Sequence, residues 1–115
     1  MSELTHWING EHVKGTSGRF ADVFNPATGE VQAKAPLANA DEMAIAVAGA
    51  SAAQPAWAAT NPQRRARVMM RFVALLNRDM DKLAEALSRE HGKTLPDAAG
   101  DVQRGRGVVE YCIGA

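Results

Sequence analysis

The hydrophobic period of this sequence changes once, near Ala40, and that change constrains the fold more than any other feature. Before Ala40, short segments that contain apolar residues are separated by turn residues, a pattern that predicts β-strands. After it, apolar residues recur about every 3.6 positions, which predicts α-helices. We therefore expect an α/β chain, with short β-hairpins in residues 1–37 and about four helices in residues 38–115.

Two turns organise the hairpin region. Asn9-Gly10 lies between two short apolar stretches and is the strongest short hairpin signal, because both central positions of a type I′ turn need positive φ. Residues 21–24 and 30–35 are expected to pair across a second turn, where Pro26 presets φ and Gly29 supplies a positive φ. Pro36 should end the second of these strands.

The first helix has two candidate caps and one candidate break. Asn39 or Asp41 is expected to cap its start. Pro55 is expected to break or kink it, so that the turn around Trp57 would be a separate piece. The apolar residues of this helix fall near one face: Met43, Val47, Ala50 and Trp57.

Capping residues also delimit the other helices. The second begins either with a Thr60–Gln63 capping box or with Asn61 as cap and Pro62 at the first helical position. Its expected buried stripe is Val68, Phe72, Leu75 and Leu76.

The third helix starts at Asp79, and Gly92 fits the left-handed position just past its end. Thr94 and Asp97 form a capping box that opens the fourth helix. The expected apolar stripes are Met80, Leu83, Ala84 and Leu87 in the third helix, and Ala98, Val102, Gly105, Val109 and Cys112 in the fourth.

Composition favours helices that lean on a larger partner. Hydrophobic residues make up 46% of the chain, but 22 of the 115 residues are Ala and aromatic residues are only 5%. Because Ala buries less area than Leu, the core energy per residue is low. The formal net charge is zero, so nothing attracts the chain to nucleic acid or to an anionic membrane.

The sequence also indicates a compartment. No run approaches the roughly 20 apolar residues of a membrane span, and the N-terminus lacks the features of a secretory or transit peptide. The single cysteine excludes an internal disulfide framework and fits a reducing compartment. We therefore expect a cytoplasmic protein without membrane or nucleic-acid partners.

Several apparent motifs carry no chemistry. Gly92-Lys93-Thr94 imitates the tail of a phosphate-binding loop, but Leu87 stands where that motif needs glycine. Gly105-Arg106-Gly107 would need a third glycine at Glu110 to bind a dinucleotide.

Cys112 is interpreted as a packed core residue, because it lies on the apolar face at a helix C-terminal end. The histidines His6, His12 and His91 share no metal spacing, and the arginines Arg64, Arg65, Arg67 and Arg71 are interpreted as a solvated face.

Three motifs follow one another in an order typical of one enzyme family. They are Asn25-Pro26-Ala27-Thr28-Gly29-Glu30, then Glu90-His91-Gly92-Lys93-Thr94, then Asp101-Val102-Gln103-Arg104-Gly105. Together they resemble the N-terminal part of the aldehyde dehydrogenases. Their residues are most similar to those of the CoA-acylating branch that acts on methylmalonate semialdehyde. The resemblance implies an N-terminal portion whose helices pack beside a Rossmann-like NAD domain encoded after Ala115. The nucleophilic cysteine, the oxyanion asparagine and the main NAD contacts would also lie downstream, so none maps onto this chain.

The resemblance implies a complete reaction for the parent enzyme. NAD and CoA would convert methylmalonate semialdehyde to propionyl-CoA, CO2 and NADH, in valine or inositol breakdown, in a homo-oligomer. This chain alone would be inactive and bind neither cofactor. The alternatives are a portion of another NAD(P)-dependent semialdehyde dehydrogenase, or a non-catalytic helical interaction module.

Arg104 is the one candidate site residue. In the methylmalonate branch, the resemblance implies that an arginine at this position binds the substrate carboxylate. The rigid fork of a guanidinium suits that task. The alternative is a surface ion pair with Asp101, three residues earlier on the same helix.

Overall fold

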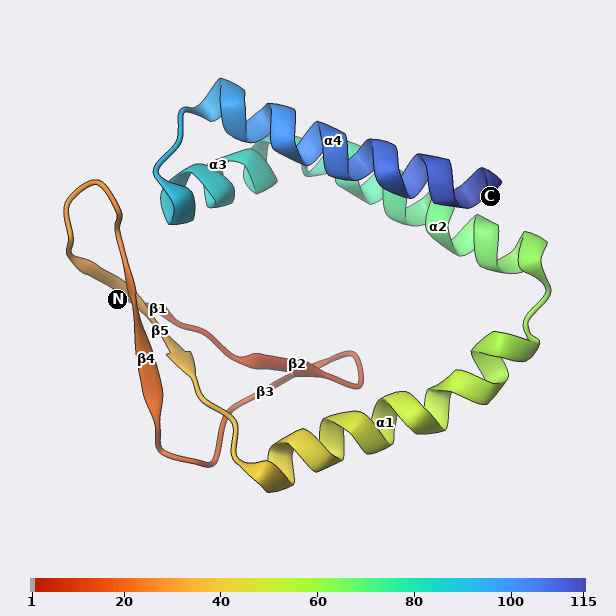
Figure 1. The fold of residues 1–115 in the computed structure, drawn as a ribbon, viewed down its shortest axis with the longest axis horizontal. Coiled ribbons are helices and arrows are strands. Elements are labelled where there is room, and N and C mark those ends of the chain that lie inside the picture. Colours follow the sequence, from red (N-terminus) through yellow and green to blue (C-terminus); the bar gives the residue numbers. More distant parts are fainter. Residues whose placement is uncertain (1) are drawn as a thin grey trace. The chain divides into compact units, whose positions relative to one another are not determined.

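The computed structural model describes residues 2–115 and contains the expected strands and four helices (Figure 1). It divides into two compact units, one ending at Ala59 and the other comprising Thr60–Ala115. Among its described residues, the first unit holds five strands and a helix: β1 Ser2–Glu3, β2 His6–Ile8, β3 Glu11–Val13, β4 Phe20–Phe24, β5 Val31–Pro36 and α1 Ala40–Ala59. The second holds three helices: α2 Pro62–Arg78, α3 Met80–His91 and α4 Leu95–Gly114.

The hairpin of β2 and β3 forms as its turn chemistry predicts. Asn9 and Gly10 have φ values of 54° and 79°, so both occupy the left-handed region that a type I′ turn requires. The strands pair antiparallel, with Trp7 opposite His12. Their rings meet edge to face with centroids 4.7 Å apart, a favourable arrangement for aromatic pairs.

The second sheet has the strand order β1-β5-β4. β4 and β5 pair antiparallel across the predicted turn, where Gly29 has a φ of 77° and its N–H donates to the Asn25 carbonyl at 2.8 Å. β5 ends at Pro36, as predicted. β1, which pairs parallel with β5, was not predicted, because two residues are too few to show any period.

A reciprocal cap between Asn39 and Glu42 starts α1. Asn39 Oδ1 accepts from the Glu42 N–H at 2.8 Å, and Glu42 Oε2 accepts from the Asn39 N–H at 2.9 Å. The other carboxylate oxygen, Oε1, accepts from the Thr16 N–H at 2.6 Å. The structure therefore selects Asn39 over Asp41 as the cap, and Glu42 also ties the helix to the loop after β3.

Glu42 is buried, with 8% of its surface exposed. The backbone hydrogen bonds from Asn39 and Thr16 hold the pKa of this carboxyl below its ordinary value of 4.5. Because the folded-state pKa is the lower one, the stabilisation is present above pH 4.5 and is lost as pH falls through the folded pKa.

We expect Glu42→Gln to lower the thermal unfolding midpoint at pH 7, since a neutral amide replaces an ionised acceptor of two backbone N–H groups. The difference from wild type should shrink as pH is lowered below 4.5, because wild type then loses the same charge. Circular dichroism melts at several pH values measure it, and Glu11→Gln, in an exposed strand position, is the control. A difference that stays constant down to pH 3 would contradict this account.

The expected break at Pro55 is wrong, because α1 runs unbroken from Ala40 to Ala59 and includes both Pro55 and Trp57. Proline removes one N–H donor from the helix. The flanking sequence is rich in alanine, the residue with the highest helix propensity, which favours continuing the helix through that defect.

The caps at Asn61, Gly92 and Thr94 are confirmed, whereas Asp79 precedes α3 without a capping hydrogen bond from its side chain. Asn61 Oδ1 accepts from the Gln63 N–H at 2.8 Å with Pro62 at the first helical position, which decides between the two predicted starts of α2. Gly92 ends α3 with a φ of 86°. Thr94 Oγ1 accepts from the Asp97 N–H and begins α4.

The predicted apolar stripes are only partly covered. Ala84 of α3 and Ala98 of α4 are buried, but three of the four stripe residues of α2 are exposed: Val68, Phe72 and Leu75. Met43, Val47 and Trp57 of α1 are exposed as well. The period located the face of α2, but the apolar residues of α1 surround that helix, and Ile45 is exposed together with the predicted stripe. Period alone also does not supply the element that would cover an exposed face.

Candidate functional site

The link between α3 and α4, residues 92–94, contributes to the surroundings of Arg104. Gly92 turns the chain, Ser88 Oγ donates to the Lys93 carbonyl at 2.6 Å, and Thr94 caps the next helix. The backbone of Lys93 is thereby fixed from both sides. Seven residues into α4, Asp101 reaches back to this link and hydrogen-bonds the Lys93 ammonium.

Asp101 binds two cations through different oxygens. Lys93 Nζ contacts Oδ2, and Arg104 Nη1 lies 3.2 Å from Oδ1. The Lys93 side chain is 23% exposed, whereas that of Arg104 is 83% exposed. The ion pair between Arg104 and Asp101 is therefore present, and most of the surface of the Arg104 side chain remains exposed.

The charges around Asp101 keep it ionised. The hydrogen bond from Lys93 lowers the pKa of the Asp101 carboxyl below its ordinary value of 3.8, and the positive charges of Lys93 and Arg104 lower it further. Partial desolvation acts in the opposite direction and is outweighed. At neutral pH this cluster therefore presents a carboxylate held between an ammonium and a guanidinium.

An apolar groove of about 410 Å³ lies on the second unit. It is lined by residues of α2, α3 and α4: Phe72, Leu76, Leu83, Leu87, Val102, Gly105, Arg106 and Val109. Arg106 donates from Nη1 to Asn77 Oδ1 at 2.8 Å, and its Nε lies 3.4 Å from Glu110 Oε1. Arg106 therefore ties α4 to α2, a role that sequence reasoning did not assign to it.

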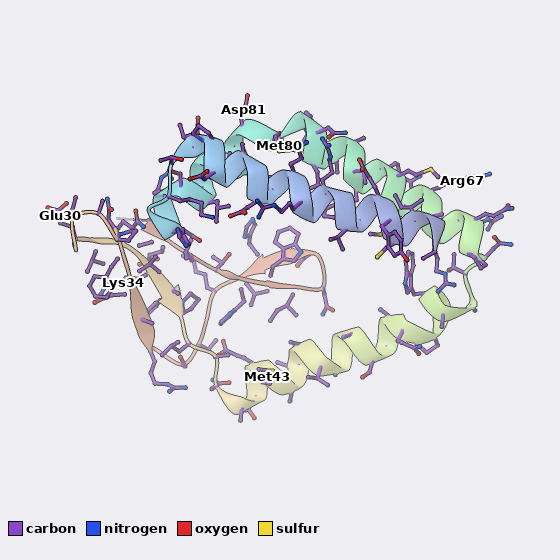
Figure 2. All side chains as sticks on the ribbon, turned by 45° about the horizontal axis from the view of Figure 1, so that its top comes forward. Glu30, Lys34, Met43, Arg67, Met80 and Asp81 are labelled. Carbon is purple, nitrogen blue, oxygen red and sulfur yellow. The ribbon has the colours of Figure 1, made fainter. Side chains whose placement is uncertain are left out.

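The structure also shows whether Cys112 and the arginine run of α2 are buried or exposed. Cys112 is exposed, so its interpretation as a core residue is wrong: it lies near the free end of α4, where no described element covers it. Of the arginine run, Arg64, Arg67 and Arg71 are exposed as expected, and Arg65 is half-buried. Arg67 is labelled on α2 in Figure 2.

Within residues 2–115, no three His, Cys, Asp or Glu side chains come together in a way that would hold a metal ion. None of the helices described combines the length and the apolar character that crossing a bilayer requires.

This chain is similar in sequence to known proteins of one enzyme family. Residues 12–115 match the model of the aldehyde dehydrogenase family. A malonate-semialdehyde dehydrogenase of Pseudomonas aeruginosa is 49% identical over 115 residues, which are all of this chain and 23% of that protein. A methylmalonate-semialdehyde/malonate-semialdehyde dehydrogenase [acylating] of Caenorhabditis elegans is 48% identical over 91% of this chain and 20% of its own length.

Solved structures agree in fold. A Sinorhizobium meliloti protein, assigned as a methylmalonate-semialdehyde dehydrogenase and complexed with NAD, superposes with a TM-score of 0.96 at 62% identity, over 99% of this chain and 23% of that one. The methylmalonate-semialdehyde dehydrogenase of Oceanimonas doudoroffii gives 0.94 at 42% identity, with the same coverage. The chain spans about a quarter of the length of these relatives and matches their N-terminal part. By sequence and by fold, it belongs to the aldehyde dehydrogenase family, whose members are oxidoreductases.

Proposed function

We propose that this chain is the N-terminal part of an NAD-dependent, CoA-acylating methylmalonate-semialdehyde dehydrogenase. The observation that carries the proposal is the 62% identity and matching fold with the Sinorhizobium meliloti protein. In the proposed reaction the aldehyde carbon is oxidised and its hydride reduces NAD. The carboxylate leaves as CO2 and a proton takes its place on the α-carbon, while CoA gives up its thiol proton and takes the acyl group as propionyl-CoA.

In this proposal Arg104 binds the substrate carboxylate. Its side chain is 83% exposed, and the contact with Asp101 runs from Nη1 to Oδ1. The remaining N–H donors suit bidentate recognition of a second carboxylate. An aldehyde that carries a carboxylate would therefore gain binding energy that a neutral aldehyde lacks.

The chemistry itself is assigned to the rest of the enzyme. Cys112 lies at an exposed position near the C-terminal end of α4, eight residues or about two helical turns beyond Arg104. The exposed stripe of Val68, Phe72 and Leu75 suits packing against the NAD domain. We propose that residues 1–115 alone neither oxidise aldehydes nor bind NAD tightly, and that the parent enzyme is a homo-oligomer.

The test is the full-length enzyme that begins with this chain. With methylmalonate semialdehyde and NAD, NADH formation should depend on CoA, and mass spectrometry should detect propionyl-CoA. Residues 1–115 alone, assayed in parallel, should form no NADH. Oxidation that proceeds equally without CoA and yields a free acid would overturn the assignment to the acylating branch.

A second candidate differs only in the substrate. The Pseudomonas aeruginosa relative is a malonate-semialdehyde dehydrogenase, so the parent enzyme would act on a semialdehyde without the methyl branch. The ratio of kcat/KM for malonate and methylmalonate semialdehyde separates the two. A preference for the unbranched substrate favours the second candidate.

A further inference from the structure

We propose that Lys93 is a positioning residue for Arg104 and acts through Asp101. By holding one carboxylate oxygen of Asp101, it leaves only the other for the guanidinium. The inference rests on the proposed role of Arg104 in binding the substrate carboxylate, and it adds a residue that sets how freely Arg104 can do so.

The contacts divide the Asp101 carboxylate between two partners. Lys93 Nζ hydrogen-bonds Oδ2, while Arg104 Nη1 lies 3.2 Å from Oδ1. The two cations come from different places, since Lys93 precedes α4 and Arg104 lies within it. Neither oxygen is therefore free to change partner without breaking one of these contacts.

Lys93 is the more firmly held of the two cations. Its carbonyl accepts from Ser88 Oγ at 2.6 Å, between the left-handed Gly92 and the helix cap Thr94. Its side chain is 23% exposed, against 83% for Arg104. The orientation of Asp101 is thus set mainly by Lys93, and Arg104 adapts to the oxygen that remains.

Without Lys93, Asp101 would have two free oxygens beside a guanidinium. A carboxylate and an arginine in that situation form two parallel hydrogen bonds in a fork-to-fork pair. A substrate carboxylate needs the same donors, so Asp101 and substrate would compete for Arg104. Lys93 limits that competition, and it should affect carboxylated aldehydes only.

Lys93→Met in the full-length enzyme tests the inference. The KM for methylmalonate semialdehyde should rise roughly threefold to thirtyfold, the range of coupling between neighbouring charged groups. The kcat, and the KM for the neutral aldehyde propanal, should stay within twofold. Lys93→Arg should restore the lower KM, because a guanidinium also donates to Oδ2. Lys82→Met, which removes a lysine 3.5 Å from Asp79, is the matched control.

A double variant shows whether Lys93 acts through Asp101. In an Asp101→Asn background, Lys93→Met should raise the KM no further. If it still raises the KM, Lys93 meets the substrate independently and the inference is overturned. An unchanged KM in the single variant, or an equal change for propanal, overturns it as well. Arg104→Gln separates this failure from that of the proposed function: if it too leaves the KM for the semialdehyde unchanged, the role of Arg104 itself is wrong.

Discussion

Arg104→Gln should raise the KM for methylmalonate semialdehyde roughly 10- to 100-fold, as expected for losing a charge-assisted interaction with a carboxylate. The reason is geometric, since glutamine keeps much of the length but loses both the charge and the fork. The Arg104 side chain is 83% exposed and contacts Oδ1 of Asp101, so its loss removes little that holds the fold.

The neutral aldehyde propanal isolates this effect, because it offers no carboxylate to Arg104. Its kcat/KM should stay within twofold in the same variant. Arg67→Gln, at an exposed position of α2, is the matched control and should leave both aldehydes unaffected. An equal loss for charged and neutral aldehydes would show that Arg104 supports the fold rather than the substrate.

Ala98→Leu should destabilise the second unit by about 2 kcal/mol, the typical cost of overpacking a filled core position. Ala98 has no exposed surface and lies in the first turns of α4. A leucine there would have to push against its neighbours, displacing the link that carries Lys93. Arg104 should consequently lose part of its selectivity for carboxylated aldehydes.

Amide hydrogen exchange over α3 and α4 in the full-length protein measures this local loss of stability. Ala86→Leu is the control, since Ala86 lies at an exposed position of α3 and the added side chain has room. Equal protection in both variants would contradict the view that the contact between α3 and α4 is a tightly packed one.

Local chemistry predicted the boundaries of most elements. Asn9-Gly10, Gly29, Gly92 and Thr94 each act within a few residues of chain, so their φ values and caps follow from the sequence alone. The helix that continues through Pro55 shows the limit of such rules. One proline, which disfavours a helix, competes there with many alanines, which favour it.

Interactions between distant residues were not predicted. Glu42 accepts from Thr16, 26 residues earlier, and no short pattern indicates that contact. Lys93 and Asp101 meet because a helix cap folds the chain between them, so the pair is seen only once the link has its structure. The family resemblance suggested carboxylate binding by Arg104, and the spacing of three residues suggested its pair with Asp101, but the contact of Lys93 with Asp101 came from the fold.

The exposed apolar stripe of α2 shows a third limit. The hydrophobic period located this face, but it does not reveal what covers it. In the proposed enzyme the NAD domain covers the stripe of α2, which accounts for a helix that is amphipathic and yet unburied within the residues described.

The central claim is that residues 1–115 are the N-terminal part of a methylmalonate-semialdehyde dehydrogenase. Its most direct test is a chimaera in which they replace the matching segment of the Sinorhizobium meliloti protein. The measurement is the rate of CoA-dependent NADH formation from methylmalonate semialdehyde. We predict a rate within about tenfold of the unaltered protein, because 62% identity preserves most contacts of the segment. A folded, NAD-binding chimaera that oxidises propanal but not the semialdehyde would contradict the claim.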